Sequence, residues 1–268
     1  MNTPKLRFKG FDGEWKEIEL SKMASEISYG MNAASKEYDG ENKYIRITDI
    51  DEATNKYTHK NIVSPDGDLE EKFLVKENDI LFARTGASTG KTYLYDKNDG
   101  KLYYAGFLIK ANIINHNANF IFQQTKLNKY NTWVKIMSMR SGQPGINSQE
   151  YGSCKFSITS FEEENKISKF LSLLDKKIEL QSKKIEDLKL FKLCTKNQIF
   201  ENYDQVLKLK DILVKWNKKN KNNSVKYVES ISNKYGFISQ SDQFEDRNVA
   251  SKNLNNYYII EKGVFGYN

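Results

Sequence analysis

The sequence predicts an α+β fold: an irregular mixed sheet with flanking helices, followed by a long coiled-coil helix and the start of a second domain. Three observations predict it. Residues 42–158 alternate apolar and polar positions mainly with a period of two, as strands do. Residues 161–200 contain no proline or glycine and carry a regular apolar stripe. Aromatic residues make up 13% of the 268-residue chain, which favours β-rich packing over disorder.

The expected elements follow in order along the first part of the chain. A short opening segment at 1–20 contains Trp15 and leads into apolar positions at helical spacing. Strand-like runs then occur at 44–47, 79–83 and 107–113. Residues 118–139 have apolar side chains at helical spacing, which predicts a helix. Strands with separate helices indicate an α+β domain over residues 1–159.

A change of character at residue 160 predicts the start of a long helix. Ser160 and Glu163 have the spacing of a capping box. Seven residues then step by fours and threes, as the seam of a coiled coil does: Ile167, Leu171, Leu174, Ile178, Gln181, Ile185 and Leu188. Gln181 places an amide in this seam, which fixes register at some cost in stability. We expect a spacer helix at 160–203 whose seam docks a helix or a partner; a solvent-exposed charged helix is the alternative.

A second, similar pattern begins after residue 203. Residues 207–213 parallel residues 17–23 as a short amphipathic opening. Residues 258–268 parallel residues 73–83, since each has an apolar strand, a charged turn and another apolar strand. We therefore expect a partial second domain at 204–268, truncated relative to the first.

Composition limits the classes of partner and of site. A net charge of +7 and a pI near 9.0 suit an anionic partner, nucleic acid first, although an ordinary lysine-rich protein has the same balance. No apolar run reaches the roughly 18 residues of a membrane span, and no signal peptide is evident, so we expect a cytoplasmic protein without a membrane partner. The cysteines and histidines lack the spacing of metal ligands, so no metal site is expected: Cys154, Cys194, His59 and His116.

The segment from Gly86 to Thr92 suggests a nucleotide-binding P-loop but does not match one. That motif needs four residues between its glycines, and three separate Gly86 from Gly90. It also needs a helix directly after the lysine, where this chain has strand-like residues. A glycine-rich turn between strands can instead bring its backbone close to a DNA phosphate, with Arg84 and Lys91 supplying charge. A purely structural turn is the alternative.

A second loop at 141–147 is too rich in small and polar residues for a core. Its two glycines and one proline predict a tight, preshaped turn. Arg140, Gln143 and Asn147 offer donors suited to phosphates or base edges. A surface loop that only ends the domain is the alternative interpretation.

The order of these motifs resembles the DNA-specificity subunit of bacterial type I restriction-modification enzymes. Three segments carry the resemblance: the strand and glycine-rich turn within 78–110, the Ser-Gly-Gln-Pro-Gly-Ile-Asn loop, and the capped heptad helix that ends at Phe200. The chain departs from the family pattern in two places. Thr159 stands where the family has a proline, and Glu163-Glu164 stands where it has a Glu-Gln pair.

The resemblance implies a non-catalytic subunit that selects DNA. Such a subunit has two target-recognition domains, each reading half of a split site, and two antiparallel spacer helices that set the distance between halves. Its implied partners are double-stranded DNA, methyltransferase (M) subunits that modify adenine, and a restriction (R) subunit. S-adenosylmethionine, ATP and Mg would belong to those partners, so the chain itself needs no cofactor. The sequence contains no methyltransferase, nuclease or dinucleotide-binding signature.

Carried onto this chain, the resemblance implies a first target-recognition domain at 1–159, a spacer helix at 160–203 and a partial second target-recognition domain at 204–268. The residues expected to contact DNA are Arg46, Arg84, Thr85, Ser88, Lys91, Arg140, Ser141, Gln143 and Asn147. The seam residues are expected to dock a helix or a partner, including a second copy of the chain. The alternative function is a truncated interaction or decoy subunit that oligomerises through its helix without productive DNA recognition. A small nucleotide hydrolase that uses the glycine-rich turn is a third.

Overall fold

The computed structural model describes residues 3–139, 143–201, 207–234, 236–240 and 253–266. The chain divides into two compact units, Met1–Leu188 and Lys189–Asn268. The first unit combines strands and helices in the predicted α+β class. The predicted long helix is confirmed as α5 (Phe161–Phe200). The expected domain boundaries after residues 159 and 203 stay predictions.

A four-stranded antiparallel sheet forms the centre of the first unit. Its order is β2 (Ala24–Tyr29), β9 (Leu108–Ile113), β6 (Asp79–Ala83) and β7 (Thr92–Leu94). Every residue of β6 is buried, because alternate side chains enter core clusters on the two faces of the sheet. This two-sided burial explains why the strand appears in the sequence as a continuous apolar run.

Three two-stranded pairs surround the central sheet and make the architecture mixed. The pair β1 (Lys16–Glu19) with β10 (Lys155–Ile158) is antiparallel. The pair β3 (Ala34–Glu37) with β5 (Val63–Asp66) is also antiparallel. The pair β4 (Lys43–Ile45) with β8 (Leu102–Tyr104) is parallel. Short 3-10 helices connect the strands: η1 (Ile47–Asp49), η2 (Glu71–Phe73), η3 (Gly86–Ser88) and η4 (Lys97–Asp99).

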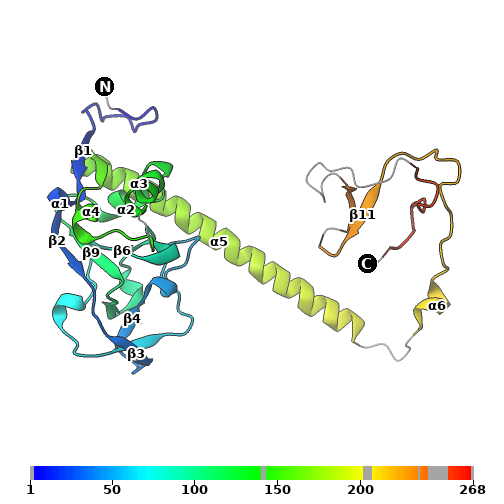
Figure 1. Ribbon diagram of the computed structural model, residues 1–268, viewed down its shortest axis with the longest axis horizontal. Coiled ribbons are helices and arrows are strands. Elements are labelled where there is room, and N and C mark those ends of the chain that lie inside the picture. Colours follow the sequence, from blue (N-terminus) through cyan, green and yellow to red (C-terminus); the bar gives the residue numbers. More distant parts are fainter. Residues whose placement is uncertain (1–2, 140–142, 202–206, 235, 241–252, 267–268) are drawn as a thin grey trace. The chain divides into compact units, whose positions relative to one another are not determined.

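Short α-helices cover one end of the first unit. They are α1 (Leu20–Met23), α2 (Ala118–Gln124), α3 (Asn128–Ser138) and α4 (Ser148–Gly152). Figure 1 shows α2, α3 and α4 beside the first turns of α5, with β3 and β4 at the other end of the same unit. The single helix expected at 118–139 is wrong, because a turn divides it. The Thr125 hydroxyl binds the Phe122 carbonyl at 2.7 Å and the Thr92 hydroxyl at 2.8 Å, which anchors that turn to the sheet.

Two further expectations about strands need correction. The strand expected at 44–47 ends at Ile45, because the Arg46 N–H group donates to the Asp49 carboxylate and η1 begins. No strand forms at 73–75, where η2 ends and Leu74 makes one isolated bridge with Tyr103.

The second unit has little regular structure among its described residues. It contains α6 (Leu209–Ile212), a four-residue helix like α1, and a hairpin of β11 (Glu229–Ser232) and β12 (Gly236–Ser239). The strands expected within 258–266 are not formed, and Tyr258 makes one isolated bridge with Lys219. Tyr267 and Asn268 lie outside the described residues. Of the two parallels that suggested a repeat, the structure therefore shows only the short opening helices, α1 and α6.

Candidate nucleic-acid interface

A cleft of about 880 Å³ opens in the first unit beside the ends of β2 and β6. Its floor includes the backbone of Gly30, Met31, Ala105 and Gly106. These two segments are hydrogen bonded, with the Gly106 N–H group 2.8 Å from the Met31 carbonyl oxygen. A Cβ atom at Gly30 would lie 2.2 Å from the Ala105 carbonyl oxygen, so only glycine allows this close approach.

The cleft brings together predicted DNA contacts from three separate segments of the chain. The predicted residues that line it are Arg46, Arg84, Thr85, Ser88 and Gln143. Lys91 and Asn147 are not among its lining residues, and Arg140 and Ser141 lie outside the described residues. Within the described part of the chain, the lining includes two arginines and no carboxylate. The cleft therefore offers an anion or a base edge several donors in one place.

Arg46 enters the cleft with its charge already paired. Its Nε atom lies 2.8 Å from one Asp49 carboxylate oxygen, and its Nη2 atom lies 2.9 Å from the other. The hydrogen bond with Asp49 raises the pKa of Arg46. Since Asp49 is buried, the Nε and Nη2 donors of Arg46 are already used in a hydrogen-bonded pair inside the protein.

Arg84 is held differently, against the face of an aromatic ring. The guanidinium carbon lies 4.7 Å from the centre of the Tyr29 ring. Its Nη1 atom makes a long hydrogen bond of 3.4 Å to the Gly106 carbonyl oxygen. Its backbone is fixed on both sides, because its N–H group donates to Phe107 and its carbonyl accepts from Ile146. The Arg84 side chain is half-buried, and it extends from a backbone that is held in place.

Tyr29 was not predicted as a site residue. It is the last residue of β2, and its hydroxyl accepts a hydrogen bond of 3.1 Å from the backbone N–H group of Ser148. Burial raises the pKa of this hydroxyl, but the hydrogen bond from Ser148 and the charge of Arg84 outweigh burial and leave the pKa below its ordinary value. The residues around Tyr29 in the sequence do not distinguish it from a tyrosine in the core, because it simply ends a strand.

The two loops that were predicted separately bind each other. Gly86 donates its N–H group to the Pro144 carbonyl at 3.0 Å, and Thr85 forms a bridge with Gly145. Gly86 has a φ angle of +71°, which favours glycine. The predicted turn between strands is confirmed, because η3 joins β6 to β7. Lys91 is followed directly by β7, so the helix that a P-loop requires is absent at that place.

The end of the second loop belongs partly to the core. Ile146 is buried, which corrects the expectation that this loop has no core residue. Asn147 caps α4: its side chain accepts from the Glu150 N–H group, and the Glu150 carboxylate accepts from the Asn147 N–H group. The oxygen of Asn147 is therefore committed to the helix. Lys91 lies outside the cleft, with its Nζ atom 3.9 Å from a Glu52 carboxylate oxygen.

The predicted seam of α5 packs against the first domain only near the start of the helix, and its later residues are exposed to solvent. Ile167 packs against the main core cluster, and Leu171 is half-buried. The next seam residues are exposed on this chain: Leu174, Ile178, Gln181, Ile185 and Leu188. The exposed fraction reaches 64% at Ile178.

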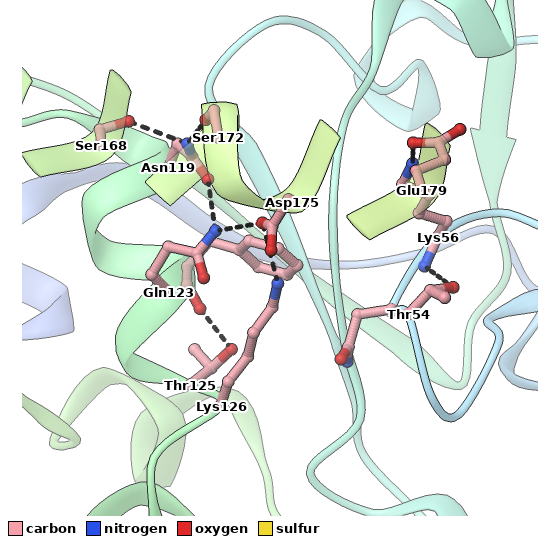
Figure 2. Close-up of polar contacts among 12 residues, drawn as sticks. Thr54, Lys56, Asn119, Gln123, Thr125, Lys126, Ser168, Ser172, Asp175 and Glu179 are labelled. Atoms are coloured by element: carbon pink, nitrogen blue, oxygen red, sulfur yellow. Dashed lines mark hydrogen bonds and ion pairs between the residues drawn. The ribbon is translucent and has the colours of Figure 1, made fainter. Parts of the chain in front are cut away.

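A neighbouring polar row, and not the exposed part of the seam, holds α5 to its own domain. Figure 2 shows the Asn119 side chain donating to the Ser168 and Ser172 hydroxyls, both at 2.8 Å. Gln123 donates to Asp175, and Lys56 pairs with Glu179 at 2.6 Å (Figure 2). The helix residues of this polar row are Ser168, Ser172, Asp175 and Glu179, which step by four and three as the seam does. A polar row at heptad spacing has the pattern of a solvated face, so sequence reasoning missed it.

The start of α5 is anchored by two buried carboxylates. Ser160 accepts from the Glu163 N–H group, but the expected capping box is only half formed. The Glu163 carboxylate instead binds Arg7 at 2.7 Å through both oxygens and accepts from the Thr159 hydroxyl. The hydrogen bond with Arg7 holds the pKa of Glu163 below its ordinary value. Glu164 accepts from the Asn117 N–H group at 2.9 Å.

Comparison with known proteins places this architecture in a family. Residues 13–190 match the type I restriction modification DNA specificity domain. The chain belongs to this family. The matched range contains the central sheet, the cleft, and α5 as far as residue 190. The resemblance inferred from the sequence motifs is therefore confirmed.

Solved structures have a similar fold at low sequence identity. A chain from a study of complex assembly and conformational transition of the type I R-M system aligns with a TM-score of 0.50 and 11% identity, over 69% of this chain and 45% of that one. The type I restriction-modification S subunit from M. genitalium gives 0.48 and 17%, over 66% and 43%. The HsdS subunit from Thermoanaerobacter tengcongensis gives 0.45 and 15%, over 72% and 51%. The specificity-domain chain described here thus spans about half the length of these proteins.

The described residues contain neither a metal-binding cluster nor a membrane-spanning helix. Among the described residues, no group of three or more histidine, cysteine, aspartate or glutamate side chains is arranged to hold a metal ion. No helix in the described ranges is long and apolar enough to cross a membrane. Cys154 is buried and Cys194 is exposed, and both are free thiols.

Proposed function

We propose that this chain recognises a DNA sequence through residues 1–159, as the specificity subunit of a type I restriction-modification complex, and performs no chemical step itself. The observation that carries the proposal is the cleft, where donors from three segments of the chain converge on one open space. The match to a DNA specificity domain supports it.

The donors in the cleft suit the two kinds of contact that DNA recognition needs. Hydroxyls such as those of Thr85 and Ser88 commonly bind phosphate oxygens and fix the register of a protein on the duplex. Arginine and glutamine side chains have paired donors or acceptors that match base edges, and Arg84 and Gln143 supply them here. Lys91 and Arg140 are proposed as outer phosphate contacts.

In the same proposal, α5 is the spacer and the scaffold of the complex. Its polar row holds the helix to the recognition domain, and its exposed seam remains available to a partner. Methyltransferase subunits dock there, so that adenine modification and restriction are directed to a split DNA site in the cytoplasm. S-adenosylmethionine, ATP and Mg are supplied by the partner subunits.

The test is a pair of measurements on the full chain with its methyltransferase. Gel shifts with labelled duplex should show a complex that needs both proteins, and sequencing of modified bases in a host that expresses both should reveal methyladenine in one split sequence. The matched variant is Thr85→Ala with Ser88→Ala, which should weaken the shift without preventing assembly. A host genome without any common methylated sequence would reject the proposal.

The exposed seam also favours a second candidate, an interaction or decoy subunit that oligomerises through α5 without productive DNA recognition. Four apolar seam residues are more than 40% exposed: Leu174, Ile178, Ile185 and Leu188. Assembly that is normal by sedimentation, together with no DNA shift and no methylated sequence, would favour this candidate over the first.

A further inference from the structure

We infer that Arg84 reads a guanine base and that Tyr29 is the residue that positions it. The inference rests on the proposed function and makes it more specific. From its place before a glycine-rich turn, Arg84 is expected to supply charge for a phosphate. The geometry of its side chain points to a different role, for the three reasons that follow.

The first reason is that the guanidinium of Arg84 lies over a ring instead of in an ion pair. The guanidinium carbon lies 4.7 Å from the centre of the Tyr29 ring. A contact with the face of a ring restrains an arginine side chain without using its N–H donors. In the described part of the chain its one hydrogen-bond acceptor is the Gly106 carbonyl oxygen, at the long distance of 3.4 Å. Arg46 provides the contrast in the same cleft, because both oxygens of Asp49 occupy its fork.

The second reason is that the stack is built from rigid parts. Tyr29 on β2 and Phe82 on β6 both pair with Ile109, from opposite sides of β9. Arg84 follows Phe82 by two residues, so Tyr29 and Arg84 lie near the same end of the sheet. The Tyr29 hydroxyl is held by the Ser148 N–H group, and the Arg84 backbone is held by Phe107 and Ile146. A side chain that is ordered before binding loses less conformational freedom on contact, which favours discrimination between bases.

The third reason is chemical. Guanine presents two acceptors, O6 and N7, side by side in the major groove, and the two parallel N–H groups of an arginine match them. A lysine carries the same charge but lacks the planar pair of donors. A phosphate contact therefore tolerates lysine with little change in sequence preference. At a guanine, lysine can still bind O6 or N7 but loses the planar pair of donors, so it discriminates less sharply than arginine. This difference makes the two roles of Arg84 experimentally separable.

The experiment selects DNA from a random duplex library with the full chain and its methyltransferase. The wild-type selection should contain a position where guanine is strongly preferred. In Arg84→Lys, preference at that one position should fall about tenfold or more, while the other positions keep theirs. Tyr29→Leu removes the stack and should weaken the preference at the same position. Tyr29→Phe retains the ring but loses the hydrogen bond from Ser148, so it should weaken the preference less than Tyr29→Leu does.

Lys91→Ala is the matched control, because an outer phosphate contact should weaken all sequences alike and lower the salt slope by roughly one. If both Arg84→Lys and Arg84→Gln select the same guanine as strongly as the wild type does, Arg84 is not a base reader. Arg84→Gln decides alone should the lysine variant fail to fold, and an unchanged guanine preference there overturns the inference. A wild-type chain that selects no sequence at all rejects the proposed function itself, which is a distinguishable failure.

Discussion

At the scale of single residues, the cleft shows that two arginines, both predicted as DNA contacts, are held by different partners. Arg46 was predicted as a DNA contact, yet its fork is occupied by a buried carboxylate. Arg84 was predicted for its charge, yet it lies over Tyr29. Arg84 was predicted because it lies just before a glycine-rich turn, whereas Arg46 belongs to a strand-like run. The partner of Arg84 could not be predicted, since the ring of Tyr29 is 55 residues away from it in the chain.

The pairing of Arg46 with Asp49 predicts an effect on stability. Replacing Arg46 by alanine leaves the buried Asp49 carboxylate without its main partner, and we expect a loss of about 1–3 kcal/mol in the free energy of unfolding. Urea unfolding followed by circular dichroism measures it. The double variant Arg46→Ala with Asp49→Asn should recover part of the loss, because the unpaired charge is removed as well. Lys91→Ala, with its long 3.9 Å contact, should stay within about 0.5 kcal/mol of the wild type.

At the scale of elements, α5 was the most predictable part of the chain, because a 40-residue helix with a regular stripe has a clear sequence pattern. Its ends and faces were less predictable. Glu163 was assigned to a local capping box, but it binds Arg7 across 156 residues of sequence. The polar row around Ser172 has no signal until Asn119 is placed opposite it. Local patterns therefore predicted the helix, and long-range contacts determined how it is held.

The Arg7–Glu163 pair predicts a dependence of stability on pH. A carboxyl whose pKa is lowered in the folded state contributes stability above its unfolded pKa, near 4.5, and that contribution is lost as the pH falls through the folded pKa. Replacing Arg7 by methionine should lower the midpoint of urea unfolding at pH 7. The difference between variant and wild type should narrow as the pH falls below about 4.5. Lys9→Met, at an exposed position, is the control, and a gap that stays constant between pH 7 and pH 3 would show that the pair is not the cause.

The seam predicts a loss of assembly without a loss of folding. Ile178 and Ile185 are exposed on this chain, so changing both to aspartate should leave the first domain folded. It should abolish assembly with the methyltransferase, because two charges would enter an apolar contact. Leu180→Asp is a matched control, since Leu180 is 58% exposed but does not belong to the seam. Pull-down of the methyltransferase at wild-type affinity by the double variant would contradict the scaffold role.

At the scale of the whole molecule, the α+β class followed from simple patterns, while the second unit was predicted poorly. The irregular sheet of the first unit is built from strands of three to six residues. Their bounds depend on individual side-chain contacts that the apolar pattern does not show, such as the Arg46–Asp49 contact that ends β4. In the second unit, the apolar runs around Tyr258 were read as strands by analogy with 73–83. Residues 258–266 form no strand, and in 73–83 only the second of the two expected strands is formed. A short apolar run does not distinguish a strand from a loop or a 3-10 turn.

The exposed seam leads to the last prediction, that two copies of this chain associate through antiparallel α5 helices. Leaving apolar side chains of this size in water forgoes roughly 1.5 kcal/mol or more each, which a second helix would recover. The seam is nearly symmetric in sequence about Gln181, since Leu174 and Leu188 both lie seven residues from it, while Ile178 and Ile185 lie three and four residues away. An antiparallel pair centred on Gln181 therefore sets Leu174 opposite Leu188 and brings Ile178 near Ile185. The two Gln181 amides then meet at the axis, where they hydrogen bond and fix the register.

Sedimentation equilibrium at micromolar concentration should therefore show a dimer, and Ile178→Asp with Ile185→Asp should return it to monomer. The relative direction of the two α5 helices is tested by disulfide formation in a Cys194→Ser background. Leu174→Cys mixed with Leu188→Cys should crosslink under mild oxidation, because the antiparallel pair brings these positions together, whereas Leu174→Cys alone should not. Crosslinking of Leu174→Cys with itself would indicate a parallel pair, and a strictly monomeric wild-type chain would show that the seam serves only a different partner.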